Sequence, residues 1–293
     1  MGSFKVRHKE PEGGATVRKF LKLASVGAIA LVCGVRSVPA QQAEEPGGEA
    51  EKMGTAEHVE TENKEAATEE KESWLPGSLS GNVAIVTDYS FRGVSQTGRD
   101  MAAQGGIDYN HDSGIFLGYW ASSTNFGNTY MENDFYGGYA GALDKWSYKL
   151  SATFFYYPKD QEFNYWELGA FTGYDFDIFS LSTGFIGSPD YFGTLGTGFY
   201  VPMGINIPIG TVTCPFPGME KKCFDLSVDS NAGYTNTSQQ IFTGTHHYWD
   251  WNTGMVFALP FNFKLDFRYV GTSEADKVRD AGNRFIFAAK YAF

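Results

Sequence analysis

The sequence has little cysteine, a deficit of basic charge and, after residue 35, no long apolar run. Only 3 of its 293 residues are Cys, which excludes a disulfide-rich scaffold. Lys and Arg number 23 against 34 Asp and Glu, and the net charge of −11 argues against a nucleic-acid partner, because phosphate binding needs a basic surface. The chain is instead 16% aromatic and 42% hydrophobic and contains 35 Gly, a composition that excludes wholesale disorder.

Charge divides the chain into three parts. Residues 1–40 sum to +5, residues 41–73 to −8 and residues 74–293 to −8. We therefore expect a signal peptide over 1–40, an acidic Glu/Ala-rich linker over 41–73 and a folded domain over 74–293.

The first part has the features of a secretory signal. Basic residues precede an apolar run from Leu23 to Val35, which is shorter than the ~20 residues that a membrane-spanning helix needs. Val38-Pro39-Ala40 then offers small residues for cleavage before Gln41. A lipoprotein reading would acylate Cys33, but Val32 stands where a small residue is expected. The sequence predicts an exported protein.

The acidic segment 41–73 has almost no large apolar side chains. It cannot bury enough surface to offset the entropy of ordering, so we predict a disordered or partly helical segment. A trimeric coiled coil is the alternative, although no heptad of large residues supports it.

After residue 73 the dominant pattern is alternation between apolar and polar residues, the period of a strand with two different faces. This part contains 46 of the 48 aromatic residues, and the alternation is cleanest over 261–269. The predicted strands cover 80–95, 101–110, 114–123, 132–142, 146–157, 163–174, 177–187, 192–205, 224–235, 246–258, 261–272 and 283–293.

Strand length and loop length both indicate a membrane barrel. A tilted strand needs ~10 residues to cross a bilayer, about twice the average in soluble sheets. Connections are short after most even-numbered strands and longer after odd-numbered ones, with Ile207 to Cys223 as the exception. We predict an all-β fold, a transmembrane antiparallel β-barrel of about 12 strands (alternatives 10 or 14). A secreted β-sandwich or lipocalin-like barrel is the competing architecture.

The exceptional connection holds Cys214 and Cys223, with two Pro and one Gly between them. In an oxidising compartment such a pair is expected to form a disulfide hairpin. A metal site and a free reactive pair are the alternatives, but no His lies nearby and the spacing is not that of a zinc site.

Several segments resemble one family. Residues 86–97, Val-Thr-Asp-Tyr-Ser-Phe-Arg-Gly-Val-Ser-Gln-Thr, are similar to the opening motif of the TorF-type porins, the Gcw_chp-like outer-membrane β-barrel proteins of proteobacteria. Segments 104–109, 113–123, 133–139, 156–158, 165–167 and 190–193 match the family in the same order. The resemblance implies an outer-membrane barrel with a channel role. The chain departs from the family in its acidic linker and in the Cys214–Cys223 insertion.

The end of the chain also carries an outer-membrane pattern. Aromatic residues share one face of the last predicted strand, at Phe285, Phe287, Tyr291 and Phe293. This arrangement resembles the last-strand signal that the outer-membrane assembly machinery reads, so we expect that machinery as a partner.

Alternation also selects the residues that would face the lumen. Asp88 and Arg92 share a face within the most recognisable motif, and we expect a structural or constriction pair there. The full set of lumen candidates is Asp88, Arg92, Asp108, Glu132, Asp134, Lys149, Glu167, Asp225, Asp229, Lys264, Asp266, Arg268, Arg284 and Lys290. Such a lining would wet a pore and screen solutes by charge, with an excess of acids that favours cations.

The predicted function is a narrow water-filled channel for small hydrophilic solutes or ions in the outer membrane of a Gram-negative bacterium. The alternatives are a non-conducting barrel that acts as an adhesin or anchor, and a lipid-modifying enzyme. His246-His247 beside Asp250 is the one cluster that suggests catalysis or a metal, but adjacent strand residues face opposite sides. We expect no cofactor and no enzymatic activity. Lipid and small solutes are the expected partners, and homo-oligomerisation and the plugging of the lumen by a loop stay open.

Overall fold

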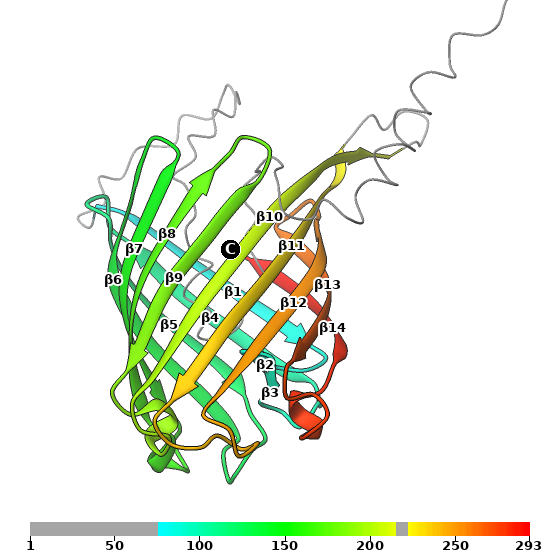
Figure 1. Ribbon diagram of the computed structural model, residues 1–293. Helices are drawn as coiled ribbons and strands as arrows, with labels where there is room; N and C mark the ends of the chain where they lie inside the picture. Colours follow the sequence, from blue (N-terminus) through cyan, green and yellow to red (C-terminus); the bar gives the residue numbers. More distant parts are fainter. Residues whose placement is uncertain (1–75, 215–221) are drawn as a thin grey trace, which may run out of the picture. The chain divides into compact units, whose positions relative to one another are not determined.

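The computed structural model describes residues 76–214 and 222–293, which form an antiparallel β-barrel (Figure 1). Its strands are β1 (Ser78–Val86), β4 (Ala102–Asn110), β5 (Ile115–Ser123), β6 (Met131–Leu143), β7 (Trp146–Tyr156), β8 (Tyr165–Asp175), β9 (Ser180–Ser188), β10 (Gly198–Thr213), β11 (Lys222–Thr237), β12 (His247–Ala258), β13 (Phe263–Thr272) and β14 (Arg284–Ala292). Each strand pairs with its neighbours in the chain, and β1 closes the ring by pairing with both β14 and β4. The predicted 12-stranded barrel is confirmed. The predictions for 1–40 and 41–73 lie outside the described residues.

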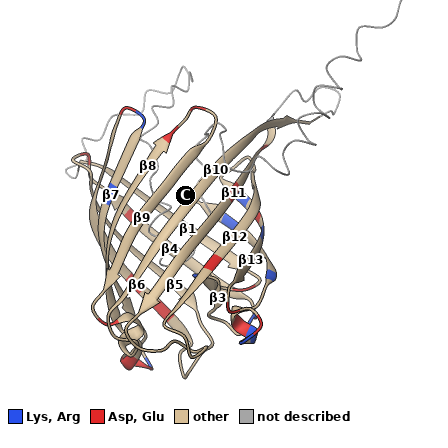
Figure 2. Cartoon of the chain, in the orientation of Figure 1, with Lys and Arg blue, Asp and Glu red and all other residues tan. Residues whose placement is uncertain are grey.

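The two faces of the barrel differ as the alternation predicts. On β12 the exposed Trp249, Trp251 and Met255 alternate with the buried Asp250 and Asn252. The same separation holds around the ring, where exposed apolar side chains form the outer surface. Most of the strand length is tan in Figure 2, because few charged residues lie along it. Among residues 76–214 and 222–293 no helix combines the length and the hydropathy that a membrane crossing requires.

The connections between strands differ in length at the two rims of the barrel. The rim with short turns includes 111–114, 144–145, 176–179 and 259–262, whereas the other rim carries longer loops at 87–101, 124–130, 157–164, 189–197, 238–246 and 273–283. Short 3₁₀ helices occur in three of these loops, η2 (Gln161–Phe163), η3 (Tyr191–Gly193) and η4 (Arg279–Ala281). The short-turn rim and the long-loop rim are therefore distinct ends, as the predicted loop lengths indicated.

The first predicted strand is wrong over its second half. β1 ends at Val86, and the rest of the predicted range 80–95 turns into the barrel as a separate two-stranded sheet, β2 (Ser90–Phe91) with β3 (Val94–Ser95). The alternation misled the prediction because a short hairpin has the same two-residue period as a long strand.

The prediction is also wrong around the cysteine insertion. Predicted strand 192–205 starts too early and stops too soon: residues 191–193 form η3, and β10 runs on to Thr213. Most of the expected long connection from Ile207 to Cys223 is therefore strand, with a bulge between Pro208 and Gly210. The extended β10–β11 hairpin projects at the short-turn rim (Figure 1). Cys214 and Cys223 form a disulfide across it with a Cα–Cα distance of 5.4 Å, which confirms the predicted pairing.

Candidate functional site

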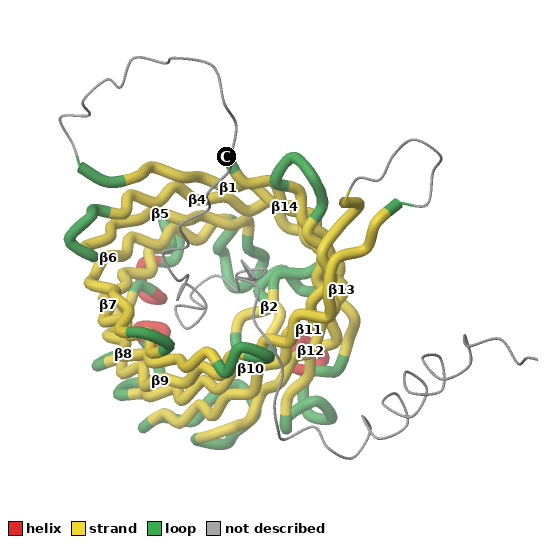
Figure 3. The backbone as a smooth tube through the Cα atoms, turned by 90° about the horizontal axis from the view of Figure 1, so that it is seen from above, coloured by secondary structure: helices red, strands yellow, loops and turns green. Residues whose placement is uncertain are grey.

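Residues 88–97 fold into the interior at the long-loop rim and are called the lumen hairpin here (Figure 3). Its two turn residues, Arg92 and Gly93, have φ angles of +47° and +79°, as a tight two-residue hairpin turn requires. A Cβ on Gly93 would lie 2.5 Å from Thr272 Cγ2 and 2.9 Å from Asp250 Cβ. The tip of the hairpin is thus pressed against β12 and β13 in a space that admits no side chain.

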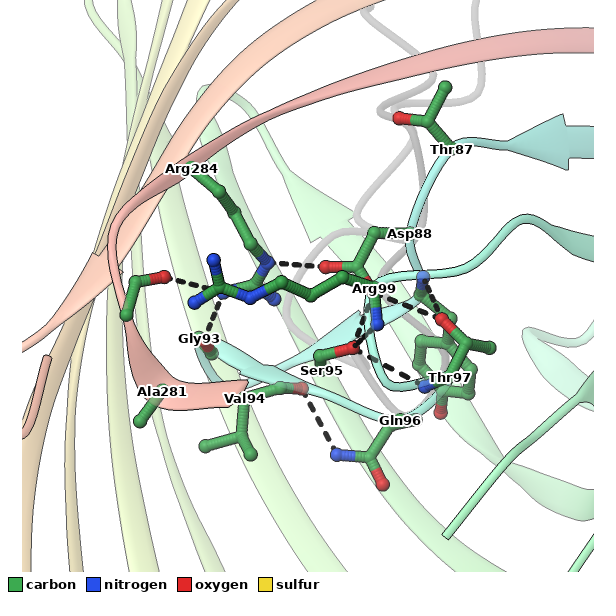
Figure 4. A network of polar contacts seen from close by, with 12 residues as sticks. Thr87, Asp88, Gly93, Val94, Ser95, Gln96, Thr97, Arg99, Ala281 and Arg284 are labelled. Atoms are coloured by element: carbon green, nitrogen blue, oxygen red, sulfur yellow. Dashed lines mark hydrogen bonds and ion pairs between the residues drawn. The ribbon is translucent and has the colours of Figure 1, made fainter. Parts of the chain in front are cut away.

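One end of the lumen hairpin is tied to β14 through Asp88 (Figure 4). Arg284 Nε donates to Asp88 Oδ2, and Arg284 Nη1 donates to the Gly93 carbonyl at 2.9 Å. The other oxygen of Asp88 accepts from Ser95 Oγ at 2.5 Å and from Thr97 Oγ1 at 3.0 Å. The carboxylate therefore joins both arms of the hairpin to the barrel wall.

The tip of the hairpin is tied to β8 through Arg92. Arg92 Nη2 donates to Glu167 Oε2 at 2.7 Å, and the two side chains are 4% and 1% exposed. The guanidinium also lies over the rings of Tyr200, Phe91 and Tyr191, with distances of 4.2, 4.7 and 5.3 Å to the centroids. Burial raises the pKa of Tyr191 to about 12, so this phenol is neutral at physiological pH.

The ion pairs Asp88–Arg284 and Arg92–Glu167 together connect opposite walls of the barrel. Five strands separate β14 from β8 in either direction around the ring, so Arg284 and Glu167 stand on opposite walls. Asp88 and Arg92 lie in the hairpin between them and bond to one wall each. The expected pair within the motif is thus replaced by two pairs, each with a partner distant in sequence. The lumen hairpin is a strut across the barrel.

Aromatic side chains and Glu132 fill the space beside the strut. Tyr89 Oη and Tyr157 Oη both donate to the carboxylate of Glu132, which is 1% exposed. Tyr89 packs edge-on against Trp120 with a centroid distance of 5.8 Å. The aromatic residues of this buried cluster are Tyr89, Phe91, Trp120, Phe155, Tyr157, Tyr165 and Tyr191. Aromatic side chains therefore lie inside the barrel as well as on its outer surface.

The remaining lumen candidates are buried or half-buried, and none is on the exposed face. Lys149 is 2% exposed and lies over Phe116, with Nζ 5.0 Å from the ring centroid. Asp108 accepts from Tyr136 Oη at 2.6 Å. The others are Asp134, Asp225, Asp229, Lys264, Asp266, Arg268 and Lys290. Their role in lining a pore stays a prediction.

Three interior residues were missed as lumen candidates. Asp250 is 3% exposed, Tyr200 packs on Arg92, and Tyr89 bonds Glu132. Asp250 could have been found, because it shares the polar face of a predicted strand with Asn252. His247 is exposed whereas Asp250 is buried, so the cluster proposed as a catalytic alternative does not share one face. Within the described ranges no group of three or more His, Cys, Asp or Glu is placed to hold a metal ion.

The residues of the expected assembly signal lie along the last strand and its end. Phe285, Tyr291 and Phe293 are exposed, at 82%, 37% and 65%, and Phe287 is half-buried against Phe267 with a centroid distance of 4.8 Å. They form an aromatic stripe on the outside of the barrel. Recognition by the assembly machinery stays a prediction.

Solved structures that align with the chain include two porins. KdgM aligns at 10% identity and a TM-score of 0.48 over 73% of this chain and 99% of its own. NanC aligns at 9% identity and a TM-score of 0.49 over 73% and 98%. LpxR from Salmonella typhimurium aligns at 9% identity and a TM-score of 0.42 over 73% of this chain and 99% of its own.

A comparison with curated proteins finds no significant match. The family model Gcw_chp, described as a bacterial protein of unknown function, matches residues 70–293 and so covers the barrel and a few residues before it. The resemblance stated on the motifs is thereby confirmed, and the chain belongs to the Gcw_chp family.

Proposed function

We propose that the protein is an outer-membrane channel for small hydrophilic solutes or ions, narrowed by the lumen hairpin at its long-loop rim. The observation that carries the proposal is the division of the barrel into two faces. Leu150 and Leu168 on the outside are 57% and 62% exposed, whereas Asp266 and Arg268 on the inside are 3% and 6% exposed. A closed barrel satisfies all strand hydrogen bonds internally and presents its apolar face to lipid.

The orientation follows from the two rims. In outer-membrane barrels the short turns face the periplasm and the longer loops face outward. In the proposed orientation the β10–β11 disulfide hairpin lies on the periplasmic side and the lumen hairpin near the external mouth. The expected signal at 1–40, the linker at 41–73 and the aromatic stripe of β14 fit export to this membrane through the assembly machinery.

A second function is supported by how tightly the strut region is packed. Side chains that line an open channel contact water, but Glu132, Glu167 and Tyr89 lie in the lumen and are each only 1% exposed. A barrel that stays filled at this level would be a non-conducting anchor or adhesin. The channel and the anchor differ in whether the lumen hairpin leaves a path for ions.

Planar-bilayer recording on the purified full chain separates them. Heat-modifiable gel migration first establishes that the barrel is folded. Discrete conductance steps from folded protein are expected for the channel. Folded protein that inserts into lipid and stays silent would overturn the channel and leave the anchor.

A further inference from the structure

Two loops of the long-loop rim, 189–197 and 238–246, enclose an open cleft of about 730 Å³, called the rim cleft here. This volume lies within the range of ~300–1,000 Å³ that is typical of sites for small molecules. The rim cleft has a polar lining. Besides two glycines, its lining side chains are Asp190, Thr194, Gln239, Gln240 and His246.

Backbone contacts hold the two loops of the rim cleft together. Ser238 N donates to the Thr197 carbonyl at 2.8 Å, and Gln239 N donates to the Leu195 carbonyl at 3.1 Å. Gly196, in the lining, has a φ of +65°, and a Cβ there would collide with Ser238 Oγ. The loops therefore meet as closely as the backbone allows, and the walls of the cleft are formed before any ligand arrives.

The rim cleft opens on the lumen side of the barrel. Asp190, Gln239 and His246 each stand two residues from a buried residue at the end of β9, β11 or β12, and residues two apart in an extended chain share a face. Those buried residues are Ser188, Thr237 and Tyr248, which are 4%, 2% and 3% exposed. Tyr191, which follows Asp190, lies against the Arg92 guanidinium of the strut. A solute in the cleft would therefore stand beside the passage.

The lining groups suit a ligand that both donates and accepts hydrogen bonds. Asp190 accepts from Gly196 N through Oδ1 at 3.2 Å, which fixes the carboxylate, and its Oδ2 has no donor among the described residues. His246 Nδ1 lies 3.1 Å from the Thr237 carbonyl, which can only accept, so the neutral ring carries its proton there and presents Nε2 as an acceptor. The amides of Gln239 and Gln240 each supply donors and an acceptor.

Charge narrows the class of ligand. Asp190 is the one Asp, Glu, Lys or Arg in the lining, so no cation is present to pair with a carboxylate or phosphate, and Asp190 would repel an anion. An ammonium group would use the carboxylate but none of the amide donors. Hydroxyl groups can donate to Asp190 and His246 and can both donate to and accept from the amides. A neutral polyhydroxylated molecule therefore uses the whole lining.

We propose that the rim cleft is a binding site for a free neutral saccharide. The proposal names the class of solute for the proposed channel. As a step in permeation it rests on that function, and as a binding site it does not.

Saturation-transfer NMR on the folded full chain tests binding without any conductance. The protein is held in LDAO, a detergent without a sugar head group. The probes are the neutral saccharides glucose, galactose, maltose and lactose, with glucuronate as the acidic counterpart. The variants are Asp190→Asn and Gln239→Ala. Their controls, Asp112→Asn and Gln161→Ala, remove the same groups from exposed positions outside the cleft.

At least one neutral saccharide is expected to bind the wild type, and to bind more tightly than glucuronate. Its Kd should rise about fivefold in each cleft variant, as for loss of one net hydrogen bond, and stay unchanged in both controls. No binding of any of the four, equal affinity for glucuronate, or unchanged binding in both cleft variants would overturn the proposal. In planar bilayers the bound saccharide should also reduce the current, less so in Asp190→Asn. A folded barrel that binds the saccharide but stays silent would refute the channel and leave the site.

Discussion

Asp88 and Arg92 lie in the same hairpin but form ion pairs with opposite walls of the barrel. Asp88 pairs with Arg284 on β14, and Arg92 pairs with Glu167 on β8. Both ion pairs are almost completely buried, so solvent does not screen the attraction between the charges. A loop held at one end only could swing aside, whereas a loop held at both ends keeps the cross-section narrow. We therefore expect these four side chains to determine how open the lumen is.

Glu167→Gln should lower the free energy of unfolding by about 3–5 kcal/mol, because it removes the counter-charge that Glu167 supplies to a buried Arg92. The urea midpoint of the folded barrel in detergent measures the change. Lys145→Ala is the control, since Lys145 and Asp177 form an exposed pair and should shift the midpoint by no measurable amount. Equal midpoints for wild type and Glu167→Gln would contradict a structural role for this pair.

Replacement of residues 88–97 by a short Gly-Ser linker should raise single-channel conductance by more than about twofold, because the strut no longer crosses the lumen. The barrel should still close, since β1 pairs with β4 from Ser78↔Asn110 to Val86↔Ala102 without the hairpin. Planar-bilayer recording gives the conductance, and heat-modifiable migration checks the fold. A folded variant with wild-type conductance would show that the hairpin is not the constriction.

Gly93→Ala should destabilise the barrel by at least about 1 kcal/mol more than Gly244→Ala, because of overpacking. Both glycines are left-handed, with φ of +79° and +80°, so the backbone strain is matched. Only Gly93 has neighbours, with Thr272 Cγ2 2.5 Å from the new Cβ, whereas nothing lies within 4 Å at Gly244. Unfolding midpoints report the difference, and equal losses would mean that the tip is not packed against β12 and β13.

Leu150→Arg should cost about 2–4 kcal/mol of folding free energy in lipid vesicles, the value for a charge near the bilayer midplane, whereas Leu143→Arg should cost about 0–1 kcal/mol near the interface. Leu150 is 57% exposed within β7, and Leu143 is 75% exposed at the end of β6 beside the short-turn rim. Denaturant titration of vesicle-folded protein measures both. Small effects of equal size at the two positions would indicate that water, not lipid, covers the outer face.

The barrel strands could be predicted because their signal is local. On β13 the exposed Phe263 and Phe267 alternate with the buried Asp266 and Arg268, and this pattern is complete within a few residues of sequence. The pairing order then follows from short connections, since consecutive antiparallel strands lie side by side. The number of strands and the disulfide between Cys214 and Cys223 needed no knowledge of distant contacts.

The strut could not be predicted in the same way. Tyr89 and Phe91 continue the odd-numbered alternation of β1, so the pattern does not reveal that the chain turns inward after Val86. The partners of the hairpin are 75 residues from Arg92 and 196 residues from Asp88, and nothing in a single sequence pairs them. The Arg92-Gly93 dipeptide was the one local indication of a tight turn, and Arg is not among the residues that turns favour.

The ion pair between Asp88 and Arg284 also restricts how the barrel can close. β1 and β14 form the seam, and their pairing extends only from Asn82↔Ala292 to Val86↔Ala288. A slip of one residue along this seam would turn Arg284 toward lipid and separate it from Asp88. Only the observed alignment of the seam keeps Arg284 beside Asp88, so we expect the docked lumen hairpin to favour the correct register when the barrel closes.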